Sequence, residues 1–285
     1  MGKSTTWMFI PGSDEKKLSK AVSINADVYI YDLEDAVANT EKKEARKKVI
    51  SHIQNHPTLN NYIRINAMPS PYMYDDLMEV IIPGVKGIVL PKAETKEEIQ
   101  FVSKIIEEKE KEYDIAIGEI HLIPLIESAL GVHNAFNIAS SSKRVRSLAF
   151  GSIDFTLDIK GEITSNGLEL LFARSQLVIA SRAARIESPI DTVFSDFRDS
   201  EGLTRETRLI KELGFQGKLV IHPSQISIVN NVFRPTQTEI EKAQQIVTAY
   251  EEYKKAGKGV FELDGKMVDL PVVEQARKII ERSQY

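Results

Sequence analysis

The sequence predicts a (β/α)8 barrel, a fold in which eight parallel strands alternate with helices. Two observations favour this fold class. Short apolar runs rich in β-branched residues recur at roughly thirty-residue spacing, and most are followed by a polar turn and a charged stretch with helical spacing. The chain also has 285 residues, enough for such a barrel as a single domain. The alternative, an open doubly wound sheet, more often has about five or six strands.

The apolar runs are expected to form the barrel strands, because parallel strands are covered on both faces and therefore lack polar alternation. In chain order the runs are Trp7–Ile10, Val28–Asp32, Tyr62–Asn66, Gly87–Pro91, Ile120–Ile126, Ser147–Gly151, Thr192–Ser195 and Lys218–His222. The clearest helices between them are Asp14–Ser23, Thr40–Gln54, Thr95–Lys111, Gly167–Ala184 and Thr204–Glu212. These elements predict a barrel domain over residues 1–233.

The pattern changes after the eighth strand. A helix is predicted over Ile240–Ala256, and the break Gly257-Lys258-Gly259 ends it. In the segment VFELDGKMVDL, Asp264-Gly265 indicates a type I′ hairpin turn, and Val272–Ser283 is predicted to be a terminal helix. Residues 234–285 are therefore expected to form a C-terminal extension of the barrel.

Composition narrows the classes of ligand. The formal net charge is −4 and basic residues are scattered, so no nucleic-acid partner is expected and the ligands should be small. The absence of cysteine excludes disulfides, thiolate metal sites and a cysteine nucleophile, and it fits a reducing compartment. No run approaches about 18 apolar residues and no signal peptide is recognisable, so we expect a cytoplasmic protein without a membrane partner.

Functional groups of a barrel lie at the C-terminal ends of its strands, and several predicted strand ends are polar. The candidates there are Asp32, Glu34, Asp35, Arg64, Asn66, Lys92, Glu127, Asp154 and His222. Carboxylates at neighbouring strand ends repel one another unless a cation or an arginine neutralises them. A metal ion held by Glu127 and Asp154 is the simplest explanation for so many acids at these strand ends. Oxygen ligands without paired histidines favour Mg²⁺, with Mn²⁺ as the alternative.

Arg64 interrupts an apolar run, and an arginine is almost never fully buried without a partner. Its planar guanidinium could bind a substrate carboxylate or stabilise an enolate oxygen, with Asn66 as a second substrate-binding candidate. The strand ends thus describe a site for a 2-oxo or 2-hydroxy acid.

Each of these residues also has a structural interpretation. A lone acid after a strand is more commonly a helix cap or a salt-bridge partner, and this applies to Asp35 in particular. His222-Pro223 is more commonly a strand-ending turn, and Lys92 could equally pair with a neighbouring acid. The joint placement of Glu127 and Asp154 therefore counts for more than either residue alone.

An ordered series of motifs resembles the citrate lyase β-subunit family of the HpcH/HpaI aldolase superfamily. The motifs are FIPG, YDLEDAV, RINA, VLPKAET, PLIESALGV, FGSIDF and GFQGKLVIHPSQISIVNNVFRPT, and the resemblance runs from about residue 6 to the end. It implies a (β/α)8 barrel, a homotrimer or a multiple of one, and making or breaking of a carbon–carbon bond beside a coenzyme A thioester.

The resemblance also implies roles for individual residues. Glu127 in PLIES and Asp154 in GSIDF would bind Mg²⁺, and Arg64 in RINA would contact the oxo-acid portion of the substrate. Glu34 and Asp35 in DLED would line the same site and act through hydrogen bonds or metal-bound water.

The C-terminal extension is implied to pack on a neighbouring subunit. Asp269, within GKMVDLP, would then reach that subunit's site. One departure from the family pattern is Ile153, which stands where many relatives have a polar residue directly before the metal-binding acid. Neither the acyl carrier subunit nor the transferase subunit of a citrate lyase complex is indicated by this chain.

The leading functional hypothesis is reversible cleavage of a citramalyl-, malyl- or citryl-CoA thioester into acetyl-CoA and a 2-oxo acid, with Asp269 protonating the enolate. Malate synthesis or thioester hydrolysis at the same site is one alternative, and an aldolase acting on free acids is another. A non-catalytic assembly subunit is the non-enzymatic alternative. Lys16, Lys17 and Lys20 could meet coenzyme A phosphates, although such residues more commonly form a solvated helix face.

Overall fold

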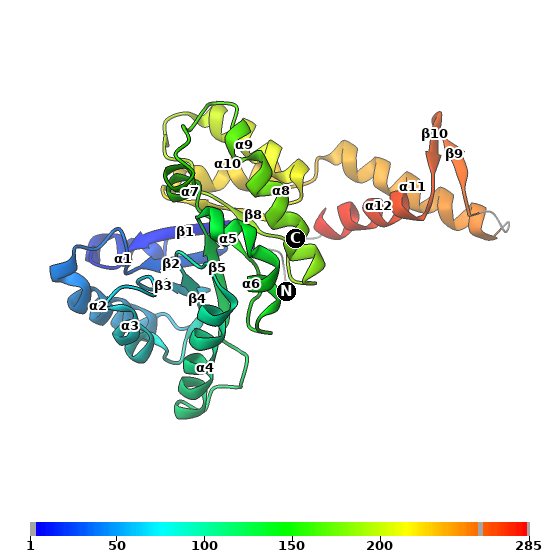
Figure 1. The fold of residues 1–285 in the computed structure, drawn as a ribbon. Coiled ribbons are helices and arrows are strands. Elements are labelled where there is room, and N and C mark those ends of the chain that lie inside the picture. Colours follow the sequence, from blue (N-terminus) through cyan, green and yellow to red (C-terminus); the bar gives the residue numbers. More distant parts are fainter. Residues whose placement is uncertain (1–3, 256–258, 284–285) are drawn as a thin grey trace. The chain divides into compact units, whose positions relative to one another are not determined.

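Eight parallel strands close into a barrel in chain order in the computed structural model, which describes residues 4–255 and 259–283 (Figure 1). The strands are β1 (Thr6–Pro11), β2 (Val28–Asp32), β3 (Asn61–Arg64), β4 (Val85–Leu90), β5 (His121–Ile126), β6 (Ala149–Phe150), β7 (Ile190–Asp191) and β8 (Gly217–Val220). Because β1 pairs with both β2 and β8, no strand of the barrel is left with a free edge. The predicted (β/α)8 barrel is confirmed.

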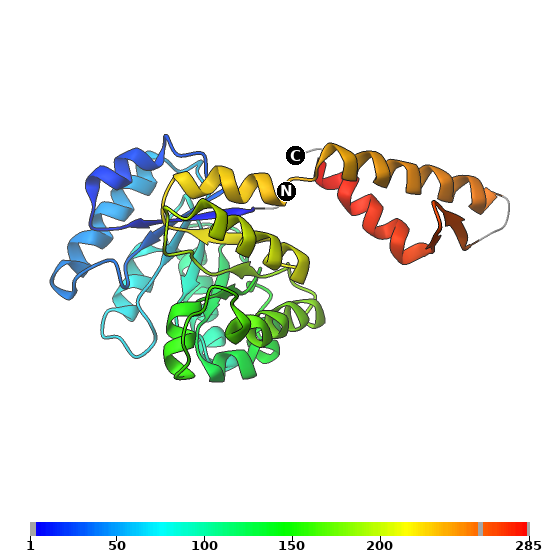
Figure 2. The same cartoon turned by 90° about the horizontal axis from the view of Figure 1, so that it is seen from above.

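Helices flank the strands of the barrel, as Figure 2 shows from above. They are α1 (Glu15–Ala21), α2 (Lys42–Asn55), α3 (Met73–Val80), α4 (Lys96–Glu112), α5 (Ala129–His133), α6 (Ala135–Ser140), α7 (Ser152–Asp158), α8 (Leu168–Ala183), α9 (Ser200–Leu213) and α10 (Ser224–Phe233), with a short 3₁₀ turn, η1 (Asn39–Glu41), before α2. Local sequence sets several starts: Asp14 caps α1, and Thr95 and Glu98 form a reciprocal capping box at α4. No described helix has both the length and the apolar character needed to cross a membrane.

Alternate residues of the strands fill the barrel interior. This core consists of Trp7, Val28, Ile30, Tyr62, Val89, Ile123, Leu125, Ala149, Ile190 and Leu219. The rings of Trp7 and Tyr62 pack edge to face at 4.9 Å. A Cβ on Gly87 would lie 2.2 Å from the Tyr62 ring, so a glycine on β4 leaves the space that this large side chain needs.

The seventh strand was predicted wrongly. The sequence placed it at Thr192–Ser195, whereas β7 is Ile190–Asp191 and ends before that segment begins. The predicted run begins directly after Asp191, a fully buried charge that ends the strand.

Asp191 belongs to a buried ion network between the barrel and its outer helices. Its carboxylate accepts hydrogen bonds from Arg174 of α8 (Nε, 2.8 Å) and from Lys218 of β8 (Nζ, 2.8 Å). Lys218 also contacts Glu206 of α9. Burial raises the pKa of Asp191, but the two cations lower it more, so its pKa lies below the usual value.

The described residues divide into two units between Asn230 and Asn231, and the second unit pairs two helices with a hairpin. It contains α11 (Gln237–Lys255), β9 (Phe261–Leu263), β10 (Lys266–Val268) and α12 (Leu270–Ser283). β9 and β10 are antiparallel, and both turn residues, Asp264 and Gly265, have positive φ, as a type I′ turn requires. Tyr250, Phe261, Val268 and Val273 form the core of this unit.

Helix boundaries in the second unit differ slightly from the expectation. α12 begins two residues before the predicted Val272–Ser283, because Asp269 accepts a hydrogen bond from the main-chain N–H of Val272 and so caps the helix. The predicted end of the preceding helix at Ala256, and Gly257 and Lys258 of the predicted break, lie outside the described residues.

Candidate active site

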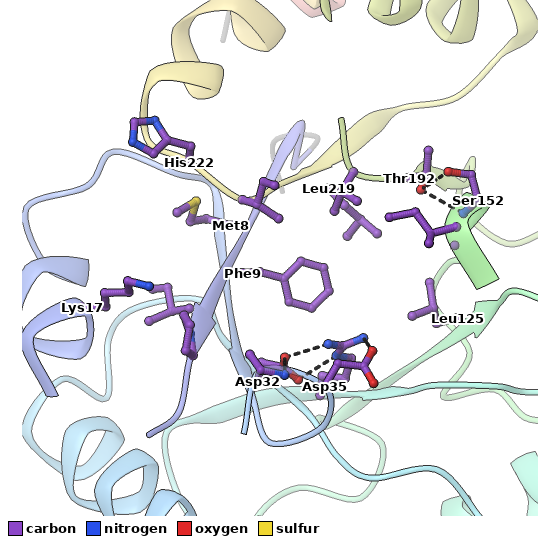
Figure 3. Close-up of a pocket in the computed structure, with 18 of the residues that line it drawn as sticks. Met8, Phe9, Lys17, Asp32, Asp35, Leu125, Ser152, Thr192, Leu219 and His222 are labelled. Atoms are coloured by element: carbon purple, nitrogen blue, oxygen red, sulfur yellow. Dashed lines mark hydrogen bonds and ion pairs between the residues drawn. The ribbon is translucent and has the colours of Figure 1, made fainter. Parts of the chain in front are cut away.

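A cavity of about 720 Å³ lies where the barrel strands end (Figure 3). Residues that end or directly follow seven different strands line it, namely Pro11, Asp32, Arg64, Glu127, Gly151, Thr192 and Ile221. Six of the nine strand-end candidates face this one cavity: Asp32, Asp35, Arg64, Glu127, Asp154 and His222. The structure therefore brings the predicted metal pair and the predicted substrate-binding arginine together.

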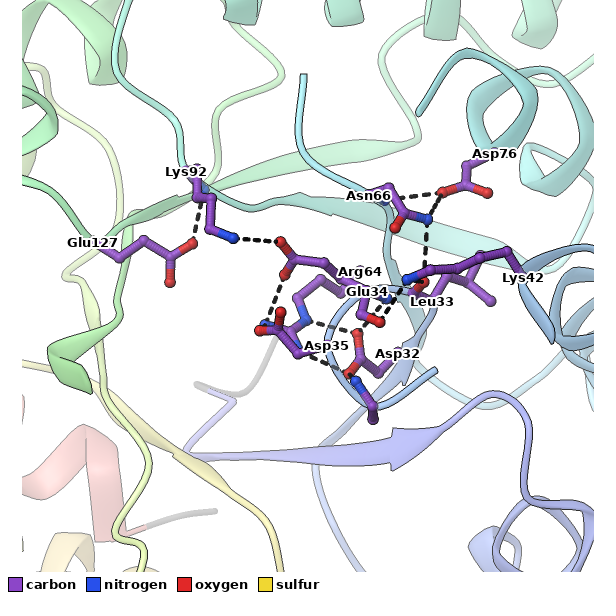
Figure 4. Close-up of polar contacts among 11 residues, drawn as sticks. Asp32, Leu33, Glu34, Asp35, Lys42, Arg64, Asn66, Asp76, Lys92 and Glu127 are labelled. Carbon is purple, nitrogen blue, oxygen red and sulfur yellow. Dashed lines mark hydrogen bonds and ion pairs between the residues drawn. The ribbon is translucent and has the colours of Figure 1, made fainter. Parts of the chain in front are cut away.

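Arg64 is held by three carboxylates (Figure 4). It lies opposite Asp32 across the β2–β3 pair and binds it through two hydrogen bonds, Nε to Oδ1 at 2.7 Å and Nη2 to Oδ2 at 2.6 Å. Its Nη1 atom lies 3.0 Å from Glu34 Oε2 and 3.2 Å from Asp35 Oδ2. Burial opposes the charge of Arg64, but the three acids raise its pKa above the ordinary value, so the guanidinium stays charged.

Asp32 is one of the strand-end candidates of the sequence, but no role in the site was assigned to it there. It ends an apolar run, and nothing in the run distinguishes it from Glu34 or Asp35, which follow it. The pairing across β2 and β3 is what makes Asp32 the main partner of Arg64, since the two residues are 32 positions apart in the chain.

Glu127 directly follows β5 and is 4% exposed. Its Oε1 atom accepts a hydrogen bond from the main-chain N–H of Lys92 at 2.8 Å. A Cβ on Gly151 would lie 2.4 Å from its Oε2 atom, so this close approach of Glu127 to β6 requires a glycine. Burial, followed by the charges of Glu34 and Asp154, raises the pKa of Glu127 to about 8. A cation placed among these acids would therefore be favoured.

Asp154 lies in the first turn of α7 and lines the cavity. Two contacts hold the start of this helix against the end of β7: the main-chain N–H of Ser152 donates to Thr192 Oγ1 at 2.9 Å, and the two hydroxyl groups also lie 2.9 Å apart. These contacts hold the helix turn that carries Asp154 against the neighbouring strand.

The donor set at Glu127 and Asp154 fits a Mg²⁺ ion. Within the described parts of the chain, no group of three or more His, Cys, Asp or Glu side chains is arranged to hold a metal. Glu127 and Asp154 would supply two carboxylates and leave the remaining positions to water and substrate. This is the usual way in which Mg²⁺ binds, because the ion loses its water reluctantly.

Asn66 has a different environment from the one the sequence suggested. It does not line the cavity. Its main-chain N–H and its Nδ2 atom donate to Asp76 Oδ2 at 2.9 and 2.6 Å, and Nδ2 also donates to the carbonyl of Leu33. Lys42 donates to the same carbonyl at 2.8 Å and to that of Glu34 at 2.7 Å. These contacts fix the main chain that carries Glu34 (Figure 4).

The cavity rim carries further polar side chains from the sequence analysis. Lys17 and Lys20 of α1 line it. His222 also lines it, stacks on Phe197 with ring centroids 4.9 Å apart, and lies with Nδ1 2.8 Å from Ser224 Oγ. Asp269 belongs to the second unit, where its Oδ1 atom caps α12.

Comparison with known proteins agrees with this geometry. Residues 5–223 match the family model described as HpcH/HpaI aldolase/citrate lyase, and residues 173–285 match the one described as a carbon–carbon bond lyase of the TIM-barrel fold. The chain is 40% identical over 278 residues to citrate lyase subunit beta of Leuconostoc mesenteroides subsp. cremoris, a match that covers 97% of this chain and 92% of the relative.

Two further relatives extend the comparison. The chain is 32% identical over 286 residues to mitochondrial citramalyl-CoA lyase of Homo sapiens, covering 96% of this chain and 83% of the relative. The crystal structure of protein CitE from Mycobacterium tuberculosis in complex with magnesium, acetoacetate and coenzyme A has a TM-score of 0.84 and 27% identity, and the match covers 99% of each chain. With its barrel, its strand-end acids and these matches, the chain belongs to the HpcH/HpaI aldolase/citrate lyase family.

Proposed function

We propose that this protein is a Mg²⁺-dependent lyase that cleaves a 3-hydroxyacyl-CoA thioester of the citramalyl-, malyl- or citryl-CoA type into acetyl-CoA and a 2-oxo acid. The observation that carries the proposal is that Glu127, Asp154 and Arg64 line one cavity. The relatives support it: one is named a citrate lyase subunit, one a citramalyl-CoA lyase, and one was crystallised with magnesium, acetoacetate and coenzyme A.

Glu127 and Asp154 are the residues that would hold the metal. When bound, Mg²⁺ supplies Lewis-acid polarisation of the hydroxyl and carboxylate oxygens of the substrate. Arg64 stays charged and is held in a fixed orientation by Asp32, so its guanidinium can stabilise the negative charge that develops on the thioester oxygen.

The cleavage requires one proton to leave and one to return. We assign the removal of the hydroxyl proton to Asp35, which would act as the base. Asp35 lines the cavity and its side chain is 59% exposed, against 3% for Asp32 and 8% for Glu34. As the hydroxyl proton leaves, the carbonyl forms, the carbon–carbon bond breaks and its electron pair passes to the thioester enolate. Asp269, on a neighbouring subunit, then protonates the enolate carbon to give acetyl-CoA.

The test is product analysis with malyl-, citramalyl- and citryl-CoA, with Mg²⁺ and after chelation by EDTA. We expect acetyl-CoA together with glyoxylate, pyruvate or oxaloacetate, only when Mg²⁺ is present and only with wild-type Glu127. Free malate from acetyl-CoA and glyoxylate would instead indicate a synthase or thioesterase. Cleavage of the free hydroxy acids would indicate an aldolase independent of coenzyme A, and no metal-dependent turnover of any substrate would indicate an assembly subunit.

A further inference from the structure

Lys92 has a backbone conformation that a lysine rarely adopts. It follows β4 and Pro91, and its φ of 51° lies in the left-handed region. In this region the Cβ atom of an L-residue crowds the following carbonyl oxygen, and glycine is the residue that avoids the cost. The chain nevertheless places a lysine at this position, directly beside the candidate active site.

This conformation lets one residue hold two acids. The main-chain N–H of Lys92 donates to Glu127 Oε1 at 2.8 Å, and its Nζ atom donates to Glu34 Oε1 at 3.2 Å (Figure 4). The next residue, Ala93, donates its N–H to the carbonyl of Leu125, which ties the turn to β5. Lys92 therefore links the acid at the end of β5 to the acid that follows β2.

Glu34 has a cation beside each of its oxygens. Arg64 lies 3.0 Å from Oε2, and Lys92 lies 3.2 Å from Oε1. Arg64 is shared with Asp32 and Asp35, whereas the ion pair of Lys92 is with Glu34. Burial lowers the pKa of Lys92, but Glu34, Asp35 and Glu127 raise it more, so the ammonium group stays charged at neutral pH.

We propose that Lys92 is a positioning residue: its left-handed backbone directs the N–H to Glu127, and its ammonium group holds Glu34. The contact of the side chain with Glu34 is then the reason that a lysine, and not a glycine, occupies this strained position. The inference deepens the proposed function, since it takes Glu127 as a metal-binding residue. It adds that the relative orientation of two acids from different strands depends on one lysine.

Three variants separate the effect of the Lys92 ammonium group from the effect of the backbone strain. Lys92→Met removes the ammonium group and keeps the strain, whereas Lys92→Gly removes the ammonium group and relieves the strain. Arg185→Gly is the matched control, because Arg185 has a φ of 59°, is exposed and follows α8 outside the candidate site. The measurements on the full chain are the melting temperature without Mg²⁺, the Kd for Mg²⁺ by calorimetry, and kcat with the best thioester.

We expect both glycine variants to melt about 2 °C or more above wild type, and Lys92→Met not to do so. Both Lys92 variants should lose about tenfold or more in kcat, whereas Arg185→Gly should keep the wild-type value. Because a cation next to two acids is lost while the main-chain N–H that holds Glu127 remains, Mg²⁺ should bind no more weakly to the Lys92 variants than to the wild type. General damage to the site would weaken metal binding and turnover together.

The inference is overturned if Lys92→Gly is stabilised and keeps full turnover, or if metal affinity and turnover fall in parallel in both Lys92 variants. It is also overturned if Lys92→Gly melts below Lys92→Met. Should the wild type bind Mg²⁺ but cleave no thioester, the proposed function fails, and the affinities and melting temperatures still decide the role of Lys92.

Discussion

Asp32 and Arg64 face each other across β2 and β3 and share two parallel hydrogen bonds of 2.7 and 2.6 Å. This arrangement fixes both the position and the plane of the guanidinium group, because a fork of two bonds leaves little freedom of rotation. The ring of Phe9, 4.9 Å from Arg64 Cζ, covers the guanidinium group. The charge of Arg64 is thus oriented before any substrate arrives.

Arg64→Lys should therefore be damaging although the charge is kept, because an ammonium group cannot reproduce the two-bond contact with Asp32. We expect kcat/KM to fall by about a hundredfold. Steady-state kinetics with the best thioester measures the loss. Arg146→Lys, which changes a half-exposed pair with Glu187, is the control and should be close to wild type. Equal activity of the two variants would contradict the role of Arg64.

Gly151→Ala should weaken Mg²⁺ binding without touching a metal-binding residue. The added Cβ would lie 2.4 Å from Glu127 Oε2 and 2.8 Å from Glu127 Cβ, so Glu127 must move. We expect the Kd for Mg²⁺, measured by calorimetry, to rise by about tenfold or more. Gly259→Ala is the control, because nothing lies within 4 Å of its added Cβ. An unchanged Kd in Gly151→Ala would argue against Glu127 as a metal-binding residue.

Lys42→Met tests the scaffold beneath the site. Lys42 is buried, and its loss leaves the carbonyl of Glu34 without that donor, at a cost of about 1–3 kcal/mol for an unsatisfied group. The carbonyl of Leu33 keeps the donor Asn66 Nδ2. Urea unfolding should show a lower free energy of unfolding, and kcat should fall because Glu34 is no longer fixed. Lys43→Met is the matched control, because Lys43 is the exposed neighbour of Lys42. It should change neither the free energy of unfolding nor kcat. A stability loss with wild-type kcat would show that the scaffold does not position Glu34.

Asp269 can be assigned to a subunit by complementation. Glu127→Gln and Asp269→Asn should each abolish turnover in homogeneous protein. If each site combines a barrel with Asp269 of a neighbour, random co-assembly of the two variants should restore about one quarter of the sites. Specific activity of co-expressed protein is the measurement. Activity that stays at the level of the separate variants would assign Asp269 to its own barrel or to no site.

Stability in acid should depend on Glu110, a fully buried acid at the end of α4. Burial raises its pKa, but Arg144, at 2.6 Å, and the main-chain N–H groups of Ile120 and Gly118 lower it more, so the folded-state pKa lies below 4.5. The stabilisation is therefore complete above about pH 4.5 and is lost as the pH falls through the folded-state value. Glu110→Gln should be less stable at pH 7 and show a flatter decline in urea unfolding toward acid pH. Parallel curves for the two proteins would contradict this assignment.

The barrel could be predicted because its strands are short apolar runs whose spacing does not depend on any single residue. The seventh strand was misplaced because Asp191 is neutralised by Arg174 and Lys218, and neither partner is close to it in the chain. The charged residues of the site were found through their position at strand ends. The contacts among these charged residues were not predictable, because strand pairing and helix packing decide which side chains meet.

Asn66 and Lys92 show this limit most clearly. Asn66 ends a predicted strand and Lys92 directly follows one, yet Asn66 turns toward Asp76 of α3, whereas Lys92 turns toward Glu34 and Glu127. The difference lies in local backbone geometry. A positive φ is expected from the sequence mainly where a glycine stands, so nothing in the sequence indicates the positive φ of Lys92.

The buried network of Arg174, Asp191 and Lys218 has a consequence for how the barrel is completed during synthesis. Lys218 lies on the last strand, so Asp191 lacks one of its two cations until β8 leaves the ribosome. A nascent chain that ends before β8 would have to bury Asp191 with Arg174 alone or keep it in water. The final strand thus delivers a charge as well as an apolar surface, and a truncated barrel should remain open at the β7 edge.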